Sequence, residues 1–179
     1  MTRFVLLLRG VNVGKGHRVP MAGLRRLLED LGHTEVRTLL NSGNAVFTST
    51  GRSARKVADA VAAGVQAAFG ISTPVIVKSA AEFSAIVRGN PIVPPEADHS
   101  RFLVAFAADE AALQGLQPLA ALVLAPERLA ITRDAAYLHC VNGLLESRVG
   151  EALLGKAGRA VTTRNWATVT KLAALLETG

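Results

Sequence analysis

The N-terminal half of the chain alternates short apolar runs with stretches of helical periodicity. Residues 3–8 (RFVLLL) form a continuous apolar run of strand length, which predicts a buried strand. After Pro20, apolar residues recur at three- and four-residue spacing up to Gly32, which predicts an amphipathic helix that ends at a glycine cap. The positions on this apolar face are Met21, Leu24, Leu27, Leu28 and Leu31.

Two more apolar runs follow, over 36–40 (VRTLL) and 45–49 (AVFTS). The residues between them, 41–44 (NSGN), are all turn formers, so the pattern predicts a β-hairpin. Valines at four-residue spacing then predict a helix over about 53–69, and residues 74–78 (PVIVK) predict another strand. The resulting order, β-α-β-β-α-β, is that of the ferredoxin-like plait.

The same order of elements repeats in the C-terminal half. Residues 89–100, rich in proline and without periodicity, predict a linker, and the run at 101–107 (RFLVAFA) predicts the first strand of a second unit. The further elements are a helix from Asp109 to about Gln117, strands over 127–133 and 135–140, a helix over 147–155, a strand over 159–163 and a last helix capped by Asn165. We therefore predict an α/β (α+β) fold of two ferredoxin-like β-α-β-β-α-β subdomains, with antiparallel sheets and a C-terminal helix, over 1–88 and 101–179.

Charge adds a functional constraint to this pattern. The chain has 179 residues, half of them hydrophobic, and a formal net charge of +6. A basic surface favours anionic partners such as nucleotides, phosphorylated metabolites, nucleic acids or acidic proteins, although it can also serve solubility alone. Aromatic residues make up only 4% of the chain and are not interleaved with the basic ones, so we predict no sequence-specific binding of nucleic acid.

Cysteine use and hydropathy bear on the compartment. Cys140 is the only cysteine, which excludes an intrachain disulfide and indicates a reducing environment. The apolar run before Arg9 is too short for a signal sequence, and no stretch approaches the roughly 18 apolar residues of a membrane span. We therefore predict a cytoplasmic protein with no membrane partner.

The loop after the first strand, residues 9–16 (RGVNVGKG), combines glycines with cations. Its spacing fits neither a Walker loop nor the dinucleotide fingerprint G-x-G-x-x-G. Arg9, Lys15 and Arg18 supply positive charge. Asn12 can donate or accept a hydrogen bond, and the glycines allow backbone N–H groups to approach a ligand closely. Alternatively, the glycines only permit a bend, while the basic side chains stay solvated.

Two other polar stretches stand between apolar elements. The first is the hairpin tip at 41–44, and the second is 162–168 (TTRNWAT), where a cation and hydroxyl groups gather at the start of the last helix. A helix N-terminus favours an anion by about 0.3–1 kcal/mol. Alternatively, Asn165 only caps the helix, Trp166 packs inward and Arg164 pairs with a surface acid.

Together these stretches form three motifs, RG-x-NVG followed by VPM, SGN-x-x-F, and TRNW-x-T. In this order, from Phe4 to about Leu176, the chain resembles the bacterial domain-of-unknown-function family numbered 1697. The resemblance implies two ferredoxin-like subdomains and no particular activity. It places these residues at the family's motif positions: Arg9, Gly10, Asn12, Gly14, Pro20, Met21, Ser42, Gly43, Asn44, Arg164, Asn165, Trp166 and Thr168. The chain departs from the family at Lys15, where a second glycine is common, and at Ala167, where asparagine is common.

No catalytic arrangement can be assigned from the sequence, so catalytic residues and cofactors stay unknown. The four histidines have no metal-ligand spacing, so we predict no metal site. No pair of carboxylates for acid–base catalysis can be picked out either. His139 and Cys140 adjoin in a predicted strand and would face opposite sides of the sheet, which argues against a Cys–His dyad. Ser42 lacks the G-x-S-x-G elbow of a nucleophilic serine.

The topology predicts that the first two polar loops are neighbours. Because a helix joins strands 3–8 and 36–40, the strands would be parallel, and loops 9–18 and 41–44 would share one edge of the sheet. We predict that this edge binds an anionic, phosphate-bearing small ligand or nucleotide. The alternatives are an enzyme acting on such a substrate and a protein-interaction module without a ligand.

The candidate ligand-binding residues are Arg9, Asn12, Gly14, Lys15, Ser42, Gly43, Asn44, Arg164 and Asn165. A structural interpretation stays open beside this one, in which Asn12, Ser42 and Asn44 hydrogen-bond one another and lock the two loops. Both interpretations predict that the loops are close together, so closeness alone does not decide between them.

Overall fold

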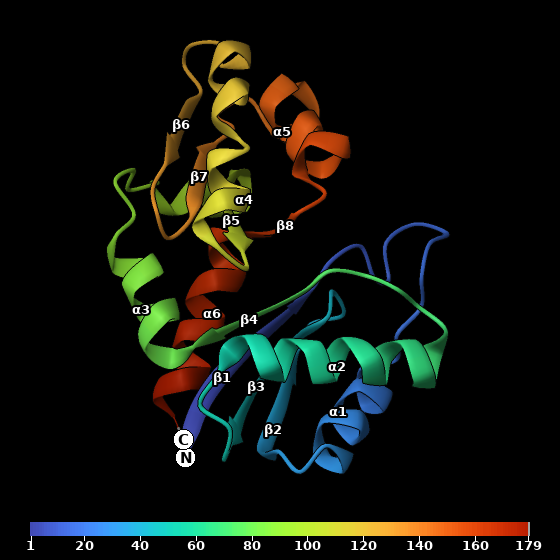
Figure 1. The fold of residues 1–179 in the computed structure, drawn as a ribbon. Helices are drawn as coiled ribbons and strands as arrows, with labels where there is room; N and C mark the ends of the chain where they lie inside the picture. The colour runs from blue at the N-terminus through green and yellow to red at the C-terminus, as the bar shows by residue number, and fades with distance from the viewer. Residues whose placement is uncertain (179) are drawn as a thin grey trace. The chain divides into compact units, whose positions relative to one another are not determined.

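The computed structural model describes residues 1–178, which divide into two compact units (Figure 1). Unit 1 comprises residues 1–83 with the end of the chain from Leu172, and unit 2 comprises Ser84–Lys171. Each unit is built on one four-stranded antiparallel sheet. The predicted mixed α/β fold of two ferredoxin-like subdomains is confirmed.

Unit 1 has the predicted order of elements. They are β1 (Thr2–Leu8), α1 (Met21–Asp30), β2 (Thr34–Leu39), β3 (Asn44–Ser49), α2 (Ala54–Phe69) and β4 (Val75–Ser79), followed by α3 (Ala80–Arg88), at whose middle unit 2 begins. The strand order is β2-β3-β1-β4. Because β1 and β2 both run antiparallel to β3, they are parallel to each other, as the connecting helix predicted.

The core of unit 1 lies between the sheet and helices α1 and α2. Alternate side chains of β1 enter this core, as the two-residue period of a strand requires, and α1 and α2 add their apolar stripes. The fully buried members include Phe4, Leu6 and Leu8 of β1, Leu24 and Leu28 of α1, and Val61 of α2. Burial of each large apolar side chain contributes about 1.5–3 kcal/mol to the stability of the unit.

Capping contacts fix the ends of two helices in unit 1. The Ser53 hydroxyl accepts a hydrogen bond from the Lys56 N–H at 3.3 Å, and Gly70, with φ of 68°, ends the same helix α2. The guanidinium of Arg3 on β1 donates to the carbonyls of Leu175 and Leu176, near the end of the C-terminal helix. A cation at the C-terminal end of a helix also complements its dipole.

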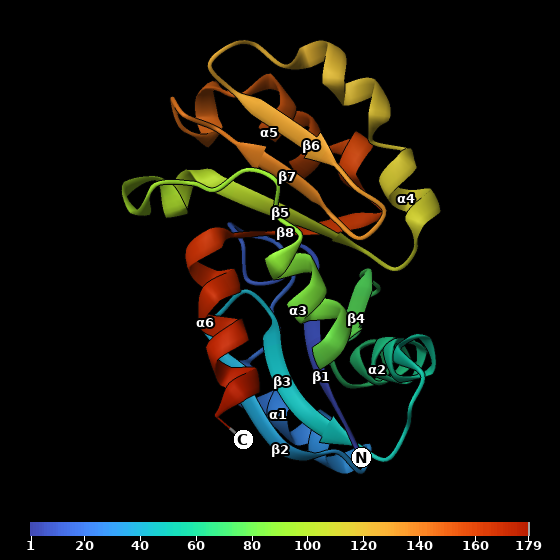
Figure 2. The ribbon, with the colours of Figure 1, turned by 90° about the vertical axis from the view of Figure 1, so that its left-hand side faces the viewer.

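Unit 2 repeats the topology with shorter helices (Figure 2). Its elements are β5 (Phe102–Ala107), α4 (Glu110–Gln114), β6 (Arg128–Ile131), β7 (Ala136–His139), α5 (Arg148–Leu154) and β8 (Val161–Asn165). The last helix, α6 (Trp166–Glu177), begins in unit 2, and its residues from Leu172 belong to unit 1. Short 3₁₀ segments lie between them: η1 (Glu96–Arg101), η2 (Gln117–Leu122), η3 (Leu144–Glu146) and η4 (Lys156–Gly158). The strand order β6-β7-β5-β8 matches that of unit 1.

Several element boundaries in unit 2 differ from the predicted ones, among them the strand predicted over 127–133, which spans only Arg128–Ile131. The strand predicted over 159–163 lies at Val161–Asn165, because Arg159 and Ala160 form a turn after η4. Arg164 therefore belongs to β8 and lies before the helix. The helix predicted to run to Gln117 ends at Gln114, followed by Gly115, and Pro118 then stands at the start of the separate segment η2.

No helix within residues 1–178 is long and apolar enough to cross a membrane.

Candidate functional site

The β1–α1 loop of unit 1 is folded back on itself. The backbone N–H of Asn12 donates to the carbonyl of His17 at 2.7 Å, and that of Gly16 donates to Val13 at 3.0 Å. Gly10, Asn12 and Gly14 have φ values of 64°, 58° and 54°, which glycine and asparagine adopt more readily than other residues. The glycines of the motif therefore serve the shape of this loop.

The side chain of Asn12 joins the β1–α1 loop to the β2–β3 turn. Its amide nitrogen donates to the carbonyl oxygens of Val19 at 2.8 Å and Asn41 at 2.7 Å, and its amide oxygen accepts from the Val19 N–H at 2.9 Å. Only an amide side chain offers two donors and an acceptor in this geometry. Loops 9–18 and 41–44 are thus neighbours, as the helix that joins the first two strands predicted.

The β2–β3 turn is closed from beneath by Asn44, which is fully buried. Its amide nitrogen donates to the carbonyl of Leu39 at 3.0 Å and to the hydroxyl of Ser42 at 3.2 Å. Positive φ values in this turn occur at Leu40 (57°) and Gly43 (80°), and Asn44 lies in strand β3.

Gly43 is where the two loops approach most closely. A Cβ atom at this position would lie 2.7 Å from Cβ of Leu8 and 2.8 Å from Cγ2 of Val11. The Gly43 carbonyl accepts a hydrogen bond from the Leu8 N–H at 2.9 Å. Glycine is therefore required both for its backbone conformation and for the absence of a side chain.

The exposed surface of the β1–α1 loop is basic. Lys15, His17 and Arg18 are exposed, and Arg9 is half-buried. Desolvation lowers the pKa of the Arg9 guanidinium, although arginine stays charged at neutral pH. Arg18 also donates to the carbonyl of Gly14, which ties one cation to the loop backbone. The basic side chains therefore lie on the solvent-exposed side of the loops, and the amide side chains of Asn12 and Asn44 lie beneath them.

Arg164 and Asn165 belong to unit 2, whereas the other candidate residues belong to unit 1. The Arg164 guanidinium is buried, donates to the hydroxyl of Thr162 and the carbonyl of Thr163, both at 2.8 Å, and burial lowers its pKa to about 10. The amide oxygen of Asn165 accepts from the Thr168 N–H at 2.9 Å. Asn165 therefore caps α6, as its position before the helix predicted.

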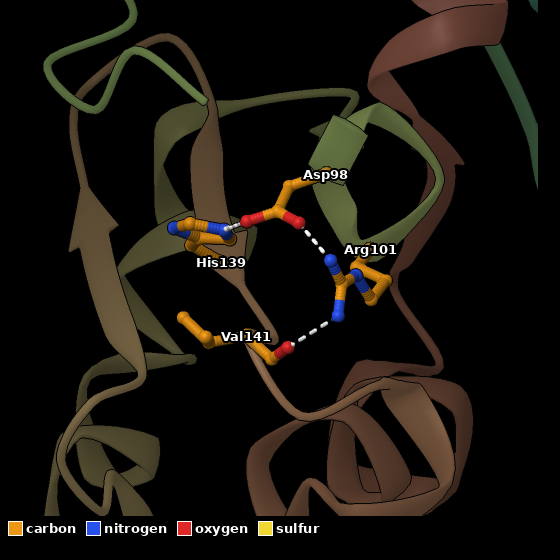
Figure 3. Close-up of polar contacts among 4 residues, drawn as sticks. All are labelled: Asp98, Arg101, His139 and Val141. Atoms are coloured by element: carbon orange, nitrogen blue, oxygen red, sulfur yellow. Dashed lines mark hydrogen bonds and ion pairs between the residues drawn. The ribbon is translucent and has the colours of Figure 1, made fainter. Parts of the chain in front are cut away.

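Unit 2 contains a charged cluster to which the sequence did not point (Figure 3). Nε2 of His139 lies 2.9 Å from Oδ2 of Asp98, and the Arg101 guanidinium pairs with the other carboxylate oxygen. Arg101 also donates to the carbonyl of Val141 at 2.8 Å. The hydrogen bond with His139, followed by the influence of Arg101, holds the pKa of Asp98 below its usual value.

This cluster fastens η1 to the end of β7. Asp98 and His139 are both buried. Their pairing joins residues 41 positions apart, and neither the short spacing of Asp98 and Arg101 nor the position of His139 in the sequence predicts it. The neighbouring Cys140 is fully buried in the core of unit 2, and burial raises the pKa of its thiol. A buried, protonated thiol is a poor nucleophile, so Cys140 is not a candidate nucleophile.

Within residues 1–178, no three His, Cys, Asp or Glu side chains are grouped so that they could hold a metal ion.

Comparison with known proteins places the chain in a family. The sequence pattern of the family described as "Protein of unknown function (DUF1697)" matches residues 1–137. The chain belongs to this family. A solved structure, that of the conserved bacterial protein SP0830 from Streptococcus pneumoniae, is similar with 26% sequence identity and a TM-score of 0.79, and the similarity covers 98% of each chain. No curated protein matches the chain.

The DUF1697 match covers the two loops of unit 1 and ends before Arg164 and Asn165. Within the matched part, Asn12 and Gly43 are the motif positions at which the two loops meet, and Asn44 holds the β2–β3 turn. The basic position Lys15, which departs from the paired glycines of the resemblance, is exposed. In this family member the loop framework and the surface charge are therefore carried by different residues.

Proposed function

We propose that unit 1 binds a small anionic ligand, phosphate-bearing and of nucleotide size or smaller, on the exposed face of the β1–α1 loop. The observation that carries this proposal is the fixation of a basic loop by the three hydrogen bonds of the Asn12 side chain. A loop held in one conformation loses little entropy when it binds, so its cations can act on a ligand at low cost.

The roles of the candidate residues differ in this proposal. Lys15 and Arg18 bind the ligand through charge, Gly14 allows the backbone to approach it, and Arg9 and Ser42 border the same edge. The remaining residues of unit 1, Asn12, Gly43 and Asn44, act indirectly by holding the loops. For Arg164 and Asn165 a ligand role stays a prediction, as do the cytoplasmic location and the lack of sequence-specific nucleic-acid binding.

A thermal-shift screen with phosphate-bearing compounds tests the proposal. Inorganic phosphate, pyrophosphate, sugar phosphates and mononucleotides form the panel, with the corresponding uncharged sugars and nucleosides as controls. A ligand at 100 times its dissociation constant adds about 2.7 kcal/mol of stability, which is visible as a raised melting temperature. If no phosphate-bearing compound raises the melting temperature at millimolar concentration, the proposal is wrong.

Charge variants locate the site once a compound is found. We expect Lys15→Ala to weaken binding about tenfold while the unliganded protein melts as before, because the side chain is exposed. Arg26→Ala, which removes an exposed cation from α1, is the matched control and should leave binding unchanged. Equal effects of both variants would show that only the overall charge matters. Turnover of the bound compound would identify the protein as an enzyme acting on it.

A further inference from the structure

Unit 1 contains a pocket at the edge of the sheet opposite to the basic loop. The pairing of β1 with β3 runs from Leu7 with Asn44 at the loop edge to Thr2 with Ser49 at the other edge. Next to Ser49 lies a pocket of about 470 Å³, bordered by the turn before β2 and by the connection from β3 to α2. Its volume lies within the range of small-molecule sites in proteins.

The walls of this pocket combine apolar and basic groups. Leu31, Val57 and Ala60 provide apolar surface. Arg52 and Lys56 line the same pocket, are exposed, and form no ion pair with any acidic residue that the structure describes. An apolar wall beside unpaired cations suits a compound that has an apolar body and an acidic group.

The third feature of the pocket is His33. Its ring stacks on Phe47 with 4.6 Å between ring centroids, and its Nε2 atom is buried and has no hydrogen-bond partner within residues 1–178. Buried polar groups in proteins are nearly always paired, so an unpaired nitrogen beside a pocket is an exception that needs an explanation. That nitrogen has almost no accessible surface, so a ligand in the pocket would contact the His33 ring rather than this atom.

We propose that this pocket is a second ligand site, specific for a small carboxylate with an apolar body. The apolar body lies against the apolar wall and the His33 ring, and the carboxylate pairs with Arg52 and Lys56. The site is independent of the anion site proposed on the β1–α1 loop, since the two lie at opposite edges of the sheet.

The ligand class is tested with three probes of related chemistry. Benzoate carries both the ring and the acid, benzyl alcohol carries the ring alone and acetate carries the acid alone. In an NMR titration we expect benzoate to shift the ring proton resonances of His33 and to bind at least tenfold more tightly than either partial probe. Binding of acetate or inorganic phosphate as tight as that of benzoate would overturn the proposal, as would no shift with benzoate at millimolar concentration.

Paired variants on α2 test the position of the ligand. Ala60→Phe fills the pocket from an exposed position and should abolish benzoate binding, whereas Ala67→Phe makes the same change at an exposed position two turns further along and should not. If Ala60→Phe binds benzoate as the unaltered protein does, the pocket is not the site.

Charge variants separate the pocket from the general attraction of a helix N-terminus. Arg52→Ala should weaken benzoate binding about tenfold, while Arg55→Ala, in the first turn of α2 but outside the pocket, should change it less than twofold. Equal losses would reduce the site to unspecific attraction and overturn the proposal. Lys15→Ala should leave benzoate binding unchanged, because Lys15 belongs to the anion site on the β1–α1 loop. The two proposals can therefore fail independently of each other.

Discussion

Units 1 and 2 share one strand order but stabilise their loops by different chemistry. In unit 1 the first strand and helix are joined by a long loop from Arg9 to Pro20. The Asn12 amide ties this loop to the β2–β3 turn, and the Asn44 amide holds the turn itself. In unit 2 only Ala108 and Asp109 join the equivalent elements, and the Asp109 carboxylate caps the helix directly.

The difference teaches that the ferredoxin-like topology leaves the connections free to specialise. Unit 1 uses uncharged hydrogen bonds and a close approach of backbones at its loop edge, which places the cations outside. Unit 2 uses the ionic cluster of Asp98, Arg101 and His139 to hold its first strand region to β7. Unit 1 is accordingly the unit in which we expect ligands, and the stability of unit 2 should depend more on acidity.

The largest expected effect is that of Gly43→Ala in unit 1. The added methyl group would lie within 2.8 Å of both Leu8 and Val11, at a residue whose φ is 80°. Backbone strain and overpacking together should lower the free energy of unfolding by about 3 kcal/mol, measured by urea denaturation followed by circular dichroism.

Gly10→Ala is the matched control for this substitution. Its φ is 64°, but no atom would lie within 4 Å of the new Cβ atom. Only the strain remains, so the loss should be about 1 kcal/mol. Equal losses for the two variants would show that the close approach of the loops at Gly43 adds nothing to stability.

Asn44→Ala should have the next largest effect. The substitution leaves the Leu39 carbonyl without the buried amide donor that it has now, so the free energy of unfolding should fall by about 2 kcal/mol. Asn41→Ala, at an exposed position of the same turn, should cost less than about 0.5 kcal/mol. Unchanged stability in Asn44→Ala, measured by the same denaturation experiment, would refute the locking role of this side chain.

These loops also show how far the sequence could predict the site. The parallel arrangement of β1 and β2 follows from the helix between them, so the closeness of loops 9–18 and 41–44 could be predicted. The partners of Asn12 could not, because the Val19 carbonyl lies in a segment without periodicity. The sequence therefore predicted which loops meet but left open whether their polar groups face a ligand or each other.

The order of the elements could also be predicted from local patterns, whereas their boundaries were predicted less accurately. Periodic apolar residues defined α1 and α2, and turn formers defined the β2–β3 hairpin. The short β8 was misplaced by two residues, because a five-residue strand has too few positions to fix its register. The pairing of Asp98 with His139 joins a segment interpreted as a linker to a strand, and no local pattern encodes such a contact.

Asp98→Asn should change unit 2 in a pH-dependent way. The pKa of Asp98 is lowered in the folded protein, so its ionised form adds stability above the ordinary carboxylate pKa of about 4, and that stability is lost as the pH falls through the folded value. The variant should melt several degrees lower at pH 7 and lose less stability on acidification. The fluorescence of Trp166, the only tryptophan and a residue of unit 2, reports the transition.

Asp134→Asn is the control for this prediction. Asp134 also lies near an arginine, with 3.8 Å between the charged groups, but both side chains are largely exposed. Exposed ion pairs contribute little, so its melting curve should follow that of the unaltered protein between pH 7 and pH 3. If Asp98→Asn and Asp134→Asn lose the same stability on acidification, the buried carboxylate stabilises unit 2 no more than the exposed one does.

The smallest expected effect is a change near neutral pH in unit 1, caused by His33. Burial lowers the pKa of its imidazole, so below the ordinary value of about 6.5 the unfolded chain binds the proton more readily than the folded one. The free energy of unfolding should therefore fall as the pH drops through 6.5 and level off below the folded pKa. His33→Phe keeps an aromatic ring over Phe47 but removes this proton uptake, so its stability should stay flat through that window.

His17→Gln, at an exposed histidine, should retain the slope of the unaltered protein in denaturation curves recorded from pH 7.5 to pH 5. Because the carboxylate in unit 2 responds only near pH 4 and below, the two windows do not overlap, and a slope that persists in His33→Phe would assign the near-neutral response to another group.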